Sequence, residues 1–368
     1  MTILDHVNPH IAQLRPYQPG KTTDEIQRTY HLSKTVKLAS NECPLPPSQK
    51  VSQAIINFMP NLARYPEDAA PRLRGKLADL NQIPAGHITF GSGSSEILEL
   101  LIRSFTQPGD NIITSEHAFA LYKILAKAAA VESQLIADQD WQQNLDGMLA
   151  AINDKTRIIF VTNPNNPTGT WVRKTALYDF IKAVPTDVLI VVDEAYTEFM
   201  DQAEYASAMP LLSQYDNLVV VRTFSKAYAL AGLRFGYGMS SAGIADILNR
   251  IRKPFNVSAV TLAAAEAALD DVEYLQQVID NNRFGMSQFK QFFDLAQLPY
   301  IDTTGNFMAV EFGDKALDIN QAMLERGVIL RPLVPYNMPE YLRISIGLPE
   351  ENQICIEQLS QVLQAVPA

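Results

Sequence analysis

The sequence predicts an α/β fold, with a mainly parallel sheet in a large domain and a smaller α+β domain after it. From about residue 50 to 250, short apolar runs alternate with helical patterns, which is typical of a parallel sheet. Three of these runs are apolar nearly throughout, as expected for strands that are covered by helices on both faces. The chain has 368 residues, which is long enough for one large domain and a smaller one.

Five apolar runs are the expected strands of the large domain: 88–90, 111–114, 157–161, 188–192 and 218–221. From Ser258 to about Leu298 the chain is rich in Ala, Leu and Gln, and this predicts a helix. The following segments 307–312, 328–330 and 341–346 alternate with helical patterns and predict the smaller domain.

The first forty residues are polar and are interrupted by Pro9, Pro16 and Pro19. This composition predicts an arm or loop rather than core, and we expect the arm to associate with the small domain. The expected division is an arm at 1–40, a large domain at 41–257 and a small domain at 258–368.

Charge and hydropathy exclude several classes of protein. A net charge of -10 argues against nonspecific binding to nucleic acid or to an anionic membrane, since both require a basic face. No apolar run approaches 18 residues, so no membrane span is expected. The N-terminus lacks the basic and then apolar pattern of a signal peptide.

Cysteine and histidine usage points to a cytoplasmic protein without a metal. Cys43 and Cys355 are the only cysteines, which suits a reducing compartment. His6 and His10 are four residues apart, but no acidic or cysteine ligands accompany them, so we expect no metal site.

Lys226 is the most informative residue of the chain. It lies just past the apolar run 218–221, where burial is expected to lower its pKa and favour a neutral amine. A neutral lysine can bond covalently to an aldehyde cofactor. Arg234, eight residues further on, carries a fixed charge that suits a phosphate. Ser225-Lys226 followed by Gly-x-Arg resembles the pyridoxal-phosphate (PLP) lysine motif of the fold type I aminotransferases.

Polar residues also follow three other expected strands, where open α/β sheets bind ligands. Gly91–Glu96 leads into a helix and can offer backbone N–H groups to a phosphate, although a simple helix-capping turn fits it as well. Asn163–Gly169 contains two Asn-Pro steps that stiffen the backbone around one amide, or it is a Pro-rich turn. Asp193 could pair with a protonated pyridine nitrogen or cap a helix.

Taken together, Asn166, Asp193, Tyr196, Lys226 and Arg234 have the order and spacing of the fold type I PLP enzymes. The resemblance covers nearly the whole chain. Four further runs are similar to those of the histidinol-phosphate aminotransferases: 37–42, 64–67, 253–257 and 342–347. The family usually has Asn-Pro and then a glycine after Asn41-Glu42, where this chain has Cys-Pro-Leu-Pro. The path of that loop therefore does not follow from the resemblance.

The resemblance implies a role for each matching residue. Lys226 is expected to hold PLP and to move the proton, with Asp193 on the pyridine nitrogen and Tyr196 and Asn166 on the ring oxygen. These roles make Lys226, Asp193 and Tyr196 the catalytic residues. The remaining cofactor contacts implied are Ser94, Ser95, Ser225 and Arg234 on the phosphate, Phe119 stacked on the ring, and Tyr65 reaching the cofactor of a neighbouring subunit. The last of these implies a homodimer.

The substrate side rests on Tyr17, Arg331 and Arg343, together with Asn166. Alternation along 341–346 places Arg343 on the face opposite Leu342 and Ile344, although a surface arginine on an edge strand would show the same pattern. The family's reaction exchanges the amino group between histidinol phosphate/imidazole acetol phosphate and 2-oxoglutarate/glutamate in histidine biosynthesis. A guanidinium can hold the phosphate of one substrate and the carboxylate of the other.

Three alternatives remain at this stage. An aromatic amino acid aminotransferase on the same scaffold would pair a ring with a carboxylate, and a PLP-dependent decarboxylase could act on a phosphorylated amino acid. A non-catalytic regulator with a PLP fold is disfavoured by the complete motif set and by the lack of a basic DNA-binding segment.

Overall fold

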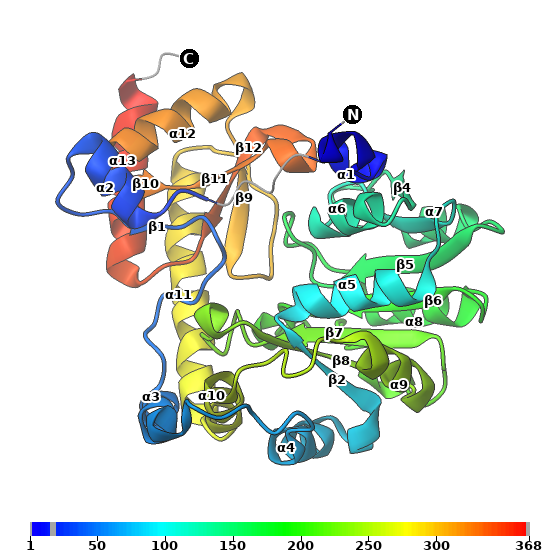
Figure 1. Cartoon of the computed structure of the whole chain (residues 1–368). Helices are drawn as coiled ribbons and strands as arrows, with labels where there is room; N and C mark the ends of the chain where they lie inside the picture. The colour runs from blue at the N-terminus through cyan, green and yellow to red at the C-terminus, as the bar shows by residue number, and fades with distance from the viewer. Residues whose placement is uncertain (1, 15–19, 366–368) are drawn as a thin grey trace.

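The structure is a computed structural model that describes residues 2–14 and 20–365. Within these residues the strands form sheets of seven, three and two strands. Figure 1 shows the largest sheet and its helices beside a smaller unit, with the long helix α11 (Val272–Leu295) running from one toward the other. We call the two units the large domain and the small domain.

The large sheet has the strand order β2-β8-β7-β6-β5-β3-β4. The strands from β3 to β7 pair in parallel, and β8 runs antiparallel to β7 and β2. Its strands are β2 (Ile88–Ser92), β3 (Asn111–Ser115), β4 (Glu132–Ile136), β5 (Thr156–Thr162), β6 (Leu189–Asp193), β7 (Leu218–Thr223) and β8 (Phe235–Ser240). The five strands expected from sequence are confirmed, each within two residues at either end.

Helices cover both faces of this sheet, which explains its apolar central strands. Along β5, Ile158 and Phe160 belong to one hydrophobic core, whereas Ile159 and Val161 belong to the other. One core also takes in α3 (Gln49–Phe58), α4 (Pro71–Asn81), α7 (Leu145–Ala150), α8 (Lys174–Ala183) and α10 (Ala259–Leu269). The other takes in α5 (Ser94–Phe105), α6 (Leu121–Ala128) and α9 (Ala242–Ile251).

The small domain packs helices against an antiparallel sheet of order β11-β12-β9. The strands are β9 (Phe307–Glu311), β11 (Arg331–Leu333) and β12 (Met338–Ser345), and the helices are α11, α12 (Ala316–Glu325) and α13 (Pro349–Ala365). Phe289 and Phe293, one turn apart on α11, pack with Leu342 and Ile344 of β12 in a separate core. Among the described residues, no helix is long and apolar enough to cross a membrane.

The first forty residues are more structured than the sequence predicts. They include α1 (Pro9–Ala12), α2 (Thr23–Tyr30) and β1 (Val36–Lys37), which pairs in parallel with β10 (Val328–Ile329). Ile26 and Val36 are buried in contact with small-domain residues, so the expectation that this segment lacks core is wrong. The segment is polar overall, and its few apolar residues become buried only when it packs against the small domain. In Figure 1, α1 lies next to α6 and α2 lies next to the small-domain helices.

The single helix expected from 258 to 298 is wrong, because the chain forms α10 and α11 with a break at Asp270-Asp271. Ser258 caps the start of α10, and the Asp271 carboxylate accepts from the N–H of Tyr274 to begin α11. Helix α10 packs against α3 and α4 in the large domain. We therefore propose a domain boundary near this break rather than at residue 257.

Strands β4 and β8 were not expected from the sequence. Strand β4 is a largely polar edge strand, and β8 contains Gly236 and Gly238, which lower its strand propensity. Both form because neighbouring strands supply their hydrogen bonds. Strand β8 has a direct bearing on the site, because it brings Gly236 against the start of α5.

Candidate active site

Residues that follow the ends of β2, β5, β6 and β7 line a cavity of about 200 Å³, together with residues from the small domain. Eleven residues expected from sequence lie around it: Ser94, Ser95, Phe119, Asn166, Asp193, Tyr196, Ser225, Lys226, Arg234, Arg331 and Arg343. Segments that are far apart in the sequence therefore supply one site.

Lys226 extends from the turn after β7 into this cavity. Its Nζ donates to the carbonyl oxygen of Ser40 at 3.4 Å and lies 5.6 Å from the centre of the Tyr196 ring. Burial, assisted by the positive charge of Arg343, lowers the pKa of Lys226 to about 8. A substantial fraction of the amine is thus neutral near pH 8, as covalent bonding to an aldehyde requires.

Asp193 ends β6 and is almost fully buried. Its Oδ2 accepts from the Tyr122 hydroxyl at 2.8 Å, and its Oδ1 accepts from the backbone N–H of Ala195 at 3.2 Å. Burial raises the pKa of Asp193 to about 6, while these two hydrogen bonds oppose the shift. A carboxylate at this depth favours a cationic partner.

The start of α5 forms an anion cradle with Arg234. Gly93 precedes the helix at φ 77°, and a Cβ there would collide with the Arg234 guanidinium. A Cβ on Gly236 would collide with the backbone nitrogen of Ser94. Arg234 Nη1 donates to Ser225 Oγ at 3.3 Å. Free N–H groups, a hydroxyl and a guanidinium thus converge where a phosphate can bind.

Asn166 and Tyr196 lie on the side of the cavity that faces the small domain. Tyr196 accepts at its hydroxyl from Asn41 Nδ2 at 3.0 Å, and burial raises its pKa to about 12. Asn166 Oδ1 accepts from Arg343 Nη1. Asn41 also exchanges hydrogen bonds with Ser345 of β12, so it connects the two domains at the site.

Arg331 and Arg343 are directly opposite each other in the antiparallel pair β11–β12, and both are buried. Arg343 Nη2 donates to the carbonyl oxygen of Ala39 at 3.0 Å, whereas its Nε has no hydrogen-bond partner among the described residues. Strand β12 is the central strand of its sheet, so Arg343 is not a surface residue on an edge. Like charges opposite each other destabilise a sheet, which favours an anion beside the pair.

Two expected residues remain. Tyr17 lies outside the described residues. Tyr65 is 81% exposed and stacks on Phe255 with ring centroids 4.6 Å apart. Within this chain, Tyr65 is therefore separate from the site.

Several residues of the site were not assigned from sequence: Gly20, Ala39, Ser40, Asn41, Thr162, Ala195, Thr223 and Tyr336. Asn41 belongs to one of the runs that carry the family resemblance, which was a signal for it. Tyr336 ends a short 3-10 helix (Val334–Tyr336) between β11 and β12, and only the folded chain brings it to the cavity.

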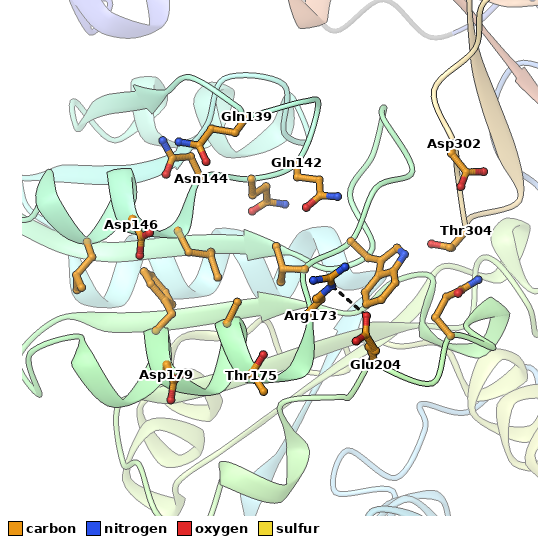
Figure 2. Close-up of a pocket in the computed structure, with 18 of the residues that line it drawn as sticks. Gln139, Gln142, Asn144, Asp146, Arg173, Thr175, Asp179, Glu204, Asp302 and Thr304 are labelled. Atoms are coloured by element: carbon orange, nitrogen blue, oxygen red, sulfur yellow. Dashed lines mark ion pairs between the residues drawn. The ribbon is translucent and has the colours of Figure 1, made fainter.

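A larger cavity of about 990 Å³ lies outside this site (Figure 2). Its charged side chains are largely paired with one another, since Arg173 Nε lies 3.0 Å from Glu204 and Lys290 lies 2.7 Å from Asp302. The labelled side chains in Figure 2 come from both domains and are mostly amides, hydroxyls and carboxylates. Lys226, Asp193 and the anion cradle with Arg234 line the smaller cavity instead.

The residues around the smaller cavity fit PLP. The buried Asp193 suits a protonated ring nitrogen, the α5 cradle with Arg234 suits a phosphate, and Lys226 suits the aldehyde. Phe119 lines the cavity and supplies an aromatic ring beside it.

Comparisons with known proteins agree with this fit. The model of the family "Aminotransferase class I and II" matches residues 33–359. The chain is 45% identical to histidinol-phosphate aminotransferase 1 of Idiomarina loihiensis over 98% of each chain. It is 46% identical to histidinol-phosphate aminotransferase 2 of Pseudomonas aeruginosa, covering 96% of this chain and 97% of that one.

A solved structure shares the fold. The histidinol-phosphate aminotransferase of Sinorhizobium meliloti in complex with pyridoxal-5'-phosphate superimposes with a TM-score of 0.89 at 26% identity over 98% of each chain. The fold expected from sequence is thus confirmed, as is PLP as the cofactor. The chain belongs to the class I and II aminotransferase family, and within it to the histidinol-phosphate aminotransferases.

Proposed function

We propose that this enzyme transfers the amino group of histidinol phosphate to 2-oxoglutarate, forming imidazole acetol phosphate and glutamate. The observation that carries this proposal is the buried pair Arg331–Arg343 at the cavity that holds Lys226. Both substrates must bring an anion to one place, a phosphate in the first half-reaction and a carboxylate in the second. Paired guanidinium groups suit both, because their planar donors match either anion.

When bound, PLP supplies the electron sink for the electrons of the substrate's broken C–H bond. Lys226 would hold the cofactor, and its amine, once released, would move the proton of the amino-bearing carbon as general base and then acid. Asp193 would hold the ring nitrogen by its negative charge. Tyr196 and Asn166 would hold the ring oxygen, and Ser225, Arg234 and the Ser94–Ser95 backbone would hold the phosphate. Phe119 would supply an aromatic ring beside the cofactor.

Steady-state kinetics with 2-oxoglutarate as acceptor test this function. We expect histidinol phosphate to be used with a much higher kcat/KM than phenylalanine, since only the former brings a phosphate to the arginine pair. An equal or higher kcat/KM for phenylalanine would instead support an aromatic amino acid aminotransferase. Release of carbon dioxide from a phosphorylated amino acid would support the decarboxylase.

Arg343→Gln is expected to reduce kcat/KM for both histidinol phosphate and 2-oxoglutarate. Loss of a charge-assisted contact costs about 1.5–3 kcal/mol, or roughly one to two decades. Arg343→Lys keeps the charge but loses the planar fork, so we expect it to be impaired as well. Single-turnover rates of each half-reaction measure these effects. Arg326→Gln, an exposed arginine after α12, is the control and should retain parent rates. If Arg343→Gln retained the parent rates, Arg343 would not bind the substrate anion, and Arg331 would be the remaining arginine to do so.

We propose that the active enzyme is a homodimer in which Tyr65 serves the partner's site. The supporting observation is a set of large apolar side chains that are exposed and close in sequence, Ile56, Met59, Leu62 and Tyr65, with Phe255 stacked on Tyr65. An exposed cluster of large apolar side chains is typical of an interaction site. Closure of this surface against a second copy would bring the Tyr65 hydroxyl to a neighbouring subunit.

Hybrid dimers test the shared site. Subunits with Tyr65→Phe are mixed with subunits carrying Lys226→Ala, so that one site of each hybrid has both lesions and the other has neither. We expect activity above that of either unmixed variant, measured as histidinol phosphate turnover after subunit exchange. No gain, despite exchange proven by tagged subunits, would contradict a shared site.

The cytoplasm is our proposed location, in keeping with the free thiols of Cys43 and Cys355.

A further inference from the structure

Tyr122 contacts the carboxylate of Asp193, yet no step described above uses it. It lies on α6 and is fully buried. Its hydroxyl donates to Asp193 Oδ2 at 2.8 Å and lies 3.0 Å from Thr162 Oγ1. Thr162 and Asp193 are direct neighbours across β5 and β6. Three polar side chains thus form a short chain of hydrogen bonds beside the cofactor cavity.

The direction of this chain follows from its chemistry. An ionised carboxylate can only accept, so the single hydroxyl hydrogen of Tyr122 points to Asp193. Burial raises the pKa of Tyr122 well above 10, and the negative charge of Asp193 raises it further, so the hydroxyl remains a donor. Thr162 must then donate to the Tyr122 oxygen. Successive hydrogen bonds of this kind polarise one another.

Packing holds the Tyr122 ring in place. It stacks on Phe160 with ring centroids 4.4 Å apart and an interplanar angle of 10°. It also meets Phe119 edge to face at 5.8 Å and 88°. Tyr122 therefore contacts both Asp193 and Phe119, the two residues placed at the nitrogen and the face of the cofactor ring.

We propose that Tyr122 is a positioning residue, whose hydroxyl keeps Asp193 ionised and aimed at the ring nitrogen of PLP, with Thr162 supporting it. This role rests on the proposed role of Asp193. The hydrogen bond stabilises the carboxylate more than the neutral acid. Without it, the proton shared between Asp193 and the ring nitrogen shifts toward Asp193. The ring then loses positive charge and withdraws electrons less strongly.

Tyr122→Phe keeps the ring and removes only the hydroxyl, so it is the direct test. The holoenzyme is prepared with PLP labelled with nitrogen-15 in the ring. We expect the nitrogen resonance to move from the position of a protonated ring toward that of a neutral ring. The PLP dissociation constant should rise about tenfold, and kcat should fall by about tenfold with KM less affected. Thr162→Val should move the resonance in the same direction by a smaller amount.

Two further variants make the outcomes decisive. Tyr178→Phe also removes a partly buried tyrosine hydroxyl hydrogen bond, but this one goes to Ser207 away from the cavity, and it should leave the resonance unchanged. Asp193→Asn should move the resonance at least as far as Tyr122→Phe.

If Asp193→Asn moves the nitrogen resonance and Tyr122→Phe does not, Tyr122 does not position Asp193. If neither moves it, the role of Asp193 is overturned too, while turnover of histidinol phosphate by the parent enzyme tests the substrate independently. If Tyr122→Phe does not fold, an unshifted Thr162→Val overturns the chain of hydrogen bonds.

Discussion

Lys226→Ala is expected to abolish covalent binding of PLP and nearly all transaminase activity. On the proposed role of Lys226, the substitution removes both the amine that holds the cofactor and the group that moves the proton. A positioned acid–base group alone contributes roughly 10²–10⁴-fold, so we expect a loss larger than this range. The measurements are the rate with histidinol phosphate and the absorbance of the bound cofactor.

Borohydride reduction followed by peptide mapping should find the cofactor attached to Lys226 in the parent protein. The peptide that contains residue 226 of the variant should carry no cofactor. Lys182→Ala, an exposed lysine of α8, should behave as the parent in both assays. A Lys226→Ala protein with the parent rate would remove Lys226 from the mechanism.

Arg222→Met is expected to lower the free energy of unfolding by about 3–5 kcal/mol. The Arg222 guanidinium donates to Glu194 Oε2 from Nε at 3.1 Å and from Nη2 at 2.8 Å. The Glu194 side chain is only 1% exposed, so the variant would leave a buried carboxylate without its cation. Chemical denaturation followed by circular dichroism measures the change. Because Glu194 directly follows Asp193, we also expect weaker PLP binding.

The matched control is Arg173→Met, since Arg173 pairs with Glu204 while both side chains are more than 60% exposed. A solvent-exposed pair contributes about 0–1 kcal/mol, so this variant should change stability little. The double variant Arg222→Met/Glu194→Gln should recover part of the loss, because it removes the unpaired charge as well. Equal losses in Arg222→Met and Arg173→Met would contradict a stabilising buried pair.

Local patterns in the sequence were enough to predict five of the seven strands of the large sheet and to single out Lys226, which lines the cavity. The central strands are apolar on both faces, and this pattern can be recognised in each strand without knowledge of the rest of the chain. Asp193 ends one such strand and Lys226 lies in the turn after another, so their position at the carboxyl edge follows from the parallel sheet. The family resemblance added roles for Asn166, Tyr196 and Arg234, whose side chains do lie around the same cavity.

Contacts between distant segments were decided only by the tertiary structure. Asn41 meets Ser345, and Tyr122 meets Asp193, through hydrogen bonds that leave no periodic signal in the sequence. The polar first forty residues hid Ile26 and Val36, whose burial depends on docking against the small domain. Arg343 could equally have been a surface residue, and it is buried because its side chain packs against Asn166 of the large domain and the backbone of Ala39. Periodicity therefore determined which residues lie at a strand end or in a core, whereas the partner of each polar side chain depended on how segments distant in the sequence pack together.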